Sequence, residues 1–133
     1  MTDPTLTSAQ VTFQTDTDNK EEDSVIEVIL RDEGDNQVAR ASGSYGAFDN
    51  FSTNGPFPLE VLNQAQRSSL QPGGSILLNF TPRNQDTLGN DNHNDNWSFN
   101  CYVDLVFSDS SHVAVSEDGL KMGPKMNQAT IGL

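Results

Sequence analysis

The chain has 133 residues, an apolar fraction of 34% and a net charge of −12, from 19 acidic and 7 basic residues. This length suits one domain with a real hydrophobic core. The acidic balance argues against nucleic acid, whose phosphates need Lys and Arg, and against direct docking on anionic lipid. Because no apolar run approaches membrane-spanning length, we expect a soluble chain, cytoplasmic as given, with secretion by another route left open.

Short runs of alternating apolar and polar residues predict β-strands along the whole chain. The clearest run is 97–107, in which every second side chain is apolar, so we expect it to be core whether or not a ligand binds. Residues 1–8 look like a loose leader, and Pro58 suggests an edge strand. The segment 63–74 has room for one helical turn, and 117–126 is expected to be irregular. The expected strands are 10–15, 24–32, 37–42, 57–62, 75–81, 97–107, 112–115 and 127–133.

Seven or eight such strands predict a single antiparallel β-sandwich that spans residues 1–133, with a jelly roll as one possible arrangement. If consecutive strands run antiparallel, alternate loops leave from the same end of the sandwich. The loops at 16–23, 43–56 and 83–95 then share one end, and the turns at 33–36, 63–74 and 108–111 share the other.

This parity argument, in which alternate loops share an end, places nine of the 19 acidic residues at one end of the sandwich. The only basic residues in the same loops are Lys20 and Arg83. Crowded carboxylates repel one another unless something compensates their charge. Calcium takes about 6–8 oxygen ligands from carboxylates, amides and backbone carbonyls, so it suits such loops. The competing interpretation is that these are ordinary solvated turn residues. The nine are Asp16, Asp18, Glu21, Glu22, Asp23, Asp49, Asp86, Asp91 and Asp95.

Two stretches resemble known calcium-binding sandwiches. TDTDNKEEDSVIEVIL is similar to the acidic first loop of C2 domains, and NDNWSFNCYVDL is similar to the stretch that enters a late strand in small PLAT-like domains. The resemblance implies calcium ligands in these loops, and membrane docking is put in doubt because His93 interrupts the Asp-x-Asp pattern. An EF-hand is excluded, since Tyr102 stands where that loop needs a bidentate Glu. The implied ligands are Asp16, Asp18, Asp23, Asp91 and Asp95.

The loop 43–56 adds aromatic side chains to the same end. Tyr45, Phe48 and Phe51 could stack on a sugar, with Asp49 between them, or could instead cap the core. The run from Asp91 to Asp95 also resembles the calcium loop of small bacterial lectins, in which sugar hydroxyls complete the coordination. A calcium-dependent lectin is therefore one alternative to a general calcium-binding recognition module.

Catalysis is the less favoured interpretation. His93 and His112 fall near opposite ends by the parity argument, and one Cys with two His gives no zinc set. Ser110 and Ser111 precede His112 in a turn, without an orienting acid or an oxyanion loop. The third hypothesis is a metal-free structural or toxin-associated domain. Its exposed strand edges would then pair with another protein or with a second copy of the chain.

Overall fold

The computed structural model describes residues 3–17, 20, 24–43, 45–81, 97–123 and 127–133. These residues form eight antiparallel strands and one four-residue helix, which confirms the predicted all-β fold. In chain order the elements are β1 (Leu6–Thr15), β2 (Val25–Arg31), β3 (Gln37–Gly43), β4 (Thr53–Val61), α1 (Arg67–Leu70), β5 (Ser75–Thr81), β6 (Trp97–Phe107), β7 (His112–Met122) and β8 (Gln128–Gly132).

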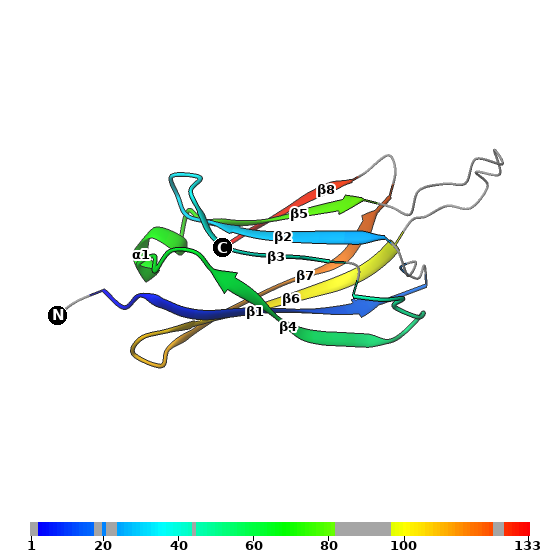
Figure 1. Cartoon of the computed structure of the whole chain (residues 1–133), viewed down its shortest axis with the longest axis horizontal. Coiled ribbons are helices and arrows are strands. Elements are labelled where there is room, and N and C mark those ends of the chain that lie inside the picture. The colour runs from blue at the N-terminus through cyan, green and yellow to red at the C-terminus, as the bar shows by residue number, and fades with distance from the viewer. Residues whose placement is uncertain (1–2, 18–19, 21–23, 44, 82–96, 124–126) are drawn as a thin grey trace.

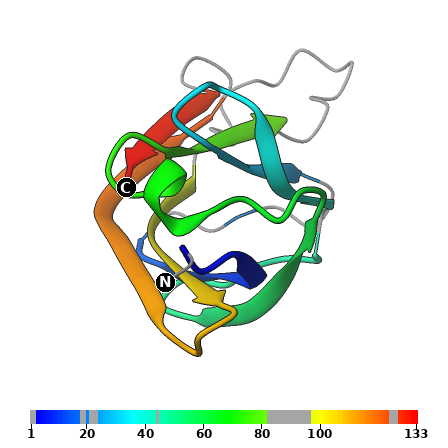
Figure 2. The ribbon, with the colours of Figure 1, turned by 90° about the vertical axis from the view of Figure 1, so that its left-hand side faces the viewer.

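The strands follow the order β7-β6-β1-β4-β3-β2-β5-β8 in one sheet. Its two layers are joined by β4, which pairs with β1 through Thr53–Leu59 and with β3 through Glu60 and Val61. Figure 1 shows the strands running along the long axis of the molecule, and Figure 2 shows the sheet curling back until β7 and β8 lie side by side. The result is a nearly closed sandwich.

The core is built from the inward side chains of all eight strands. In β6 every second residue from Trp97 to Phe107 is buried, as the alternation predicts. The Trp97 ring lies 3.8 Å from the Phe99 ring and 5.2 Å from the Phe13 ring, centroid to centroid. An aromatic cluster therefore fills the interior near the point where β6 begins.

The strand registers bear out the parity argument. Thr15 at the end of β1 lies opposite Phe99 near the start of β6, and Gly43 at the end of β3 lies opposite Ile26 near the start of β2. Thr81 at the end of β5 lies opposite Val25. The ends of β1, β3 and β5 and the starts of β2 and β6 therefore lie at one end of the sandwich, the right-hand end in Figure 1, which we call the loop end.

Three strands, β1, β4 and β7, differ from their expected bounds by more than a single residue at one end. β1 begins at Leu6 instead of residue 10, so Leu6 is buried and the expected leader at 1–8 is wrong from that residue on. β7 continues to Met122, which corrects the irregular tail expected at 117–126. β4 begins at Thr53 and is no sheet edge, although Pro58 stands in the half that pairs with β1. Among the described residues, no helix has the length and apolarity to cross a membrane.

Candidate functional site

The five expected calcium ligands are only partly placed. Asp16 follows β1 directly and is exposed at the loop end. Asp18, Asp23, Asp91 and Asp95 lie outside the described residues. Within the described ranges, no three His, Cys, Asp or Glu side chains form a group that could hold a metal ion.

The loop between β3 and β4 is tied to the end of β1 by backbone hydrogen bonds. The Phe51 N–H donates to the Asp16 carbonyl at 3.1 Å, and the Thr15 N–H donates to the Ser52 carbonyl at 2.8 Å. Ser52 closes the turn by donating to the Asp49 carbonyl from both its N–H, at 3.1 Å, and its hydroxyl, at 2.7 Å. Asp16 and Asp49, which are both exposed, are therefore held on neighbouring segments.

Phe51 is the most exposed large apolar side chain among the described residues, with 72% of its surface accessible. Its φ of +61° lies in the left-handed region, which a bulky residue rarely adopts and which costs about 1–3 kcal/mol. The hydrogen bonds to Asp16 and within the turn hold it there. Of the three predicted loop aromatics, Phe51 is thus the one that presents its ring to solvent.

Lys20 is turned into the protein, although the sequence places it in an acidic loop. Its side chain is fully buried, its ammonium donates to the Gly46 carbonyl at 2.7 Å, and the same ammonium lies 4.8 Å from the centroid of the Phe48 ring. The backbones of Lys20 and Phe48 also exchange two hydrogen bonds of 3.1 Å. Lys20 therefore fastens the first loop to the loop between β3 and β4. Sequence reasoning missed this role because no local pattern marks a buried lysine.

Of the other two loop aromatics, Phe48 faces the core and Tyr45 packs at its margin. Phe48 is 1% exposed and packs 5.6 Å from Trp97 and 6.0 Å from Phe13, so its ring fits the capping role and is not available to a ligand. Tyr45 is half-buried and stacks on Phe57, with centroids 4.4 Å apart. Burial raises the pKa of the Tyr45 hydroxyl, which therefore stays protonated and able to donate.

Tyr45 also lines a polar hollow of about 440 Å³ on the outside of β3 and β4, together with Arg40, Ser42, Pro58 and Glu60. A hydrogen-bonded row fixes one wall of this hollow. Arg40 donates to Glu27 Oε2 at 2.7 Å, and Asn79 Nδ2 donates to Glu27 Oε1 at 2.9 Å. The loop end thus carries two described features, two exposed carboxylates and one exposed phenyl ring. The polar hollow extends from Tyr45 along β3 and β4, away from that end.

Comparison with known proteins identified no relative of this chain. No family model matches the chain, no curated protein matches it, and no solved structure matches it. The site must therefore be interpreted from its own chemistry.

Proposed function

We propose that this protein is a calcium-binding recognition module whose loop end holds the ion and presents a surface to a ligand. The observation that carries the proposal is the strand register, because it brings the ends of β1, β3 and β5 and the starts of β2 and β6 to the loop end. The sequence stretches that follow β1, β3 and β5 hold the nine acidic residues named above. A recognition role is proposed in place of a catalytic one.

Electrostatics supports an ion at this end. Asp16 and Asp49 are exposed on segments that are hydrogen-bonded to each other. Acidic residues brought together in this way repel one another. A divalent cation relieves that repulsion, and calcium accepts the irregular oxygen sets that such loops supply.

The experiment that tests the proposal is a calorimetric calcium titration of the intact chain. The variants Asp16→Asn, Asp91→Asn and Asp95→Asn remove charge at the loop end, and Asp35→Asn removes the same charge at the opposite end. Asn tolerates the left-handed φ of +63° at position 35, so that control is conformationally matched. We expect calcium to bind the wild type and Asp35→Asn equally and to bind the loop-end variants at least about tenfold more weakly. Equal binding by all four variants, or no binding by the wild type, contradicts the proposal.

A calcium-dependent lectin is the second candidate, and the exposure of Phe51 beside Asp49 favours it. An exposed ring next to a bound ion can pack against the apolar face of a sugar whose hydroxyls complete the coordination. A glycan array with calcium and with EDTA tests this candidate. Binding that needs calcium and is lost in Phe51→Ala supports it, and an array that is blank in both conditions removes it. A chain that binds no calcium would instead fit the metal-free interaction domain.

A further inference from the structure

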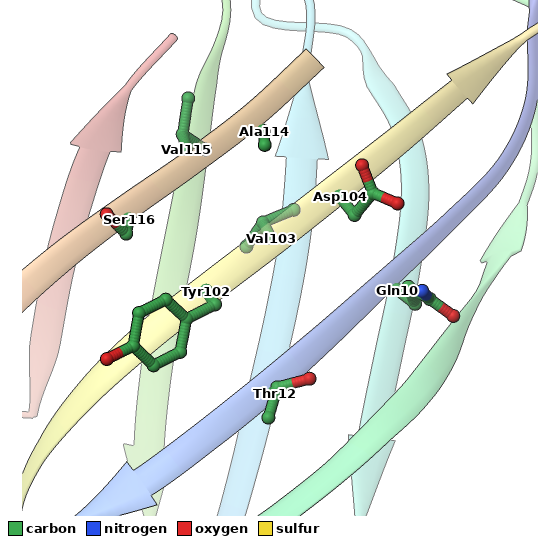
Figure 3. A pocket seen from close by; sticks show the side chains of 8 residues that line it. All are labelled: Gln10, Thr12, Tyr102, Val103, Asp104, Ala114, Val115 and Ser116. Atoms are coloured by element: carbon green, nitrogen blue, oxygen red, sulfur yellow. The ribbon is translucent and has the colours of Figure 1, made fainter. Parts of the chain in front are cut away.

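The outer face of β1, β6 and β7 carries a second hollow, of about 240 Å³, that lies away from the loop end. Outward side chains of the three strands meet there in two rows. Thr12, Tyr102 and Ser116 are in register across the strands, and so are Gln10, Asp104 and Ala114. Figure 3 shows the hollow between the Tyr102 ring on one side and Asp104 with Gln10 on the other.

Small side chains make this hollow. Thr12 and Ala114 leave space beside the larger Tyr102 and Asp104, and Val103 forms part of the floor with its side chain turned into the core. The volume lies below the roughly 300–1,000 Å³ of pockets for drug-sized molecules. The space therefore suits one small ring or one unit of a chain that lies across the sheet.

A hydrogen-bonded chain fixes the Tyr102 wall. The Tyr102 hydroxyl donates to Gln14 Oε1 at 3.1 Å, and Asn100 Nδ2 donates to the same oxygen at 3.2 Å. The Gly119 N–H in turn donates to Asn100 Oδ1 at 2.9 Å. The hydroxyl of Tyr102 is thus engaged within the protein, while 39% of the residue stays exposed and can offer a ring face.

The opposite wall is fixed as well. His112 Nδ1 lies 3.1 Å and 3.2 Å from the two oxygens of Asp104. Because a carboxylate only accepts hydrogen bonds, Nδ1 carries the proton in this contact. Asp104 keeps further acceptor capacity, and its side chain is 32% exposed toward solvent. Both walls stand on strands in fixed orientations, which lowers the entropic cost of binding.

The chemistry of the lining selects the ligand class. The lining holds a carboxylate, an amide, two aliphatic hydroxyls, a tyrosine ring and the apolar side chains of Val103, Ala114 and Val115, and it includes no Lys or Arg. A phosphate or carboxylate ligand would meet the charge of Asp104 without a cation to balance it. A neutral sugar offers hydroxyl donors to Asp104 and Gln10, and its C–H face packs against Tyr102. We infer that this hollow is a calcium-independent binding site for one pyranose unit of a glycan.

The test is an NMR titration of the full chain in EDTA with the methyl glycosides of glucose, galactose, mannose and N-acetylglucosamine. At least one glycoside should shift the backbone amides of residues 10–12, 102–104 and 114–116. Tyr102→Ser and Asp104→Asn should each weaken that binding about tenfold. Asp118→Asn, at an exposed position on β7 outside the lining, serves as the matched control and should leave it unchanged.

The variants change exposed side chains, except for Asp104, which is half-buried, and an unaltered melting curve verifies that each one folds. The inference is overturned if no glycoside binds, if the shifted amides lie at the loop end, or if Tyr102→Ser binds as the wild type does. It is also overturned if ethylammonium binds here and no glycoside does, because the site would then be one for cations. Calcium binding does not enter this test, so its outcome is separate from that of the calcium titration.

Discussion

The ammonium of Lys20 lies 4.8 Å from the centre of the Phe48 ring, inside the protein. This contact joins two loops that leave different strands, and the hydrogen bond from Lys20 to the Gly46 carbonyl strengthens the junction. A lysine that is fully buried is costly unless its charge and its donors are satisfied. Lys20 therefore belongs to the structural framework of the loop end.

Replacement of Lys20 by Met tests that role. Met keeps the apolar stem but leaves the Gly46 carbonyl without its donor, so we expect the free energy of unfolding to fall by about 2 kcal/mol. For a chain of this size the melting temperature should drop by roughly 7 °C. Lys121→Met, at an exposed position on β7, is the control and should change stability by less than about 0.5 kcal/mol. Equal melting temperatures for the two variants would show that Lys20 is not structural.

A second prediction concerns the buried indole of Trp97. Its Nε1–H donates to Thr15 Oγ1 at 3.0 Å, and both residues are buried. Thr15→Val keeps the shape but leaves the indole N–H without an acceptor, which should cost about 1–3 kcal/mol in urea unfolding. Thr15→Ser keeps the hydroxyl and should be the more stable of the two. A Val variant as stable as the Ser variant would contradict the importance of this hydrogen bond.

Gly55 offers a test of the close approach between β4 and β1. Its φ is +122°, and an added Cβ would lie 2.8 Å from the Val11 carbonyl oxygen. Gly119 also has a positive φ, +72°, but its added Cβ would meet nothing within 4 Å. Gly55→Ala should therefore destabilise the protein by at least about 2 kcal/mol more than Gly119→Ala does in chemical denaturation. Equal costs would mean that only backbone strain acts at position 55.

Cys101 gives a pH dependence with a definite sign. Burial raises the pKa of this thiol to about 12, from an ordinary value of 9.0. Because the folded state holds the proton more tightly, the contribution of the thiol to stability is complete below pH 9.0 and is lost as the pH rises toward 12. Urea unfolding at about pH 8 and about pH 10.5 should show a larger alkaline loss for the wild type than for Cys101→Ala. Parallel losses in the two proteins would contradict a buried, protonated thiol.

The sequence predicted the strands that alternate strictly, and it missed the places where pairing breaks the alternation. The start of β1 was not predicted because a register shift between Leu6 and Ser8 disturbs the alternation of buried and exposed residues. The second half of β7 was not predicted because an extra residue on β7, between Glu117 and Leu120, shifts its pairing with β6, and residues 116–119 are all exposed. Such irregularities depend on the partner strand, so a single run of residues does not reveal them.

The site was predicted unevenly for a similar reason. Turn residues and parity placed Asp16, Asp49 and Phe51 at one end correctly, because both arguments use only the order of the strands. The burial of Lys20 and Phe48 depends on contacts between two loops. The hollow at Tyr102 and Asp104 depends on β1 lying beside β6, which is distant in sequence. The alternation of apolar and polar residues in 97–107 predicted that these two side chains point outward, but it did not show which residues lie beside them.

The most direct test of the calcium proposal is a pair of melting curves of the intact wild-type chain, one in EDTA and one in excess calcium. An ion held only by the folded state raises the melting temperature through mass action. We expect a clear upward shift in calcium, retained in Asp35→Asn and reduced in Asp16→Asn, Asp91→Asn and Asp95→Asn. Coincident curves for the wild type would contradict the calcium-binding module, and a shift that survives in all three loop-end variants would move the ion away from the loop end.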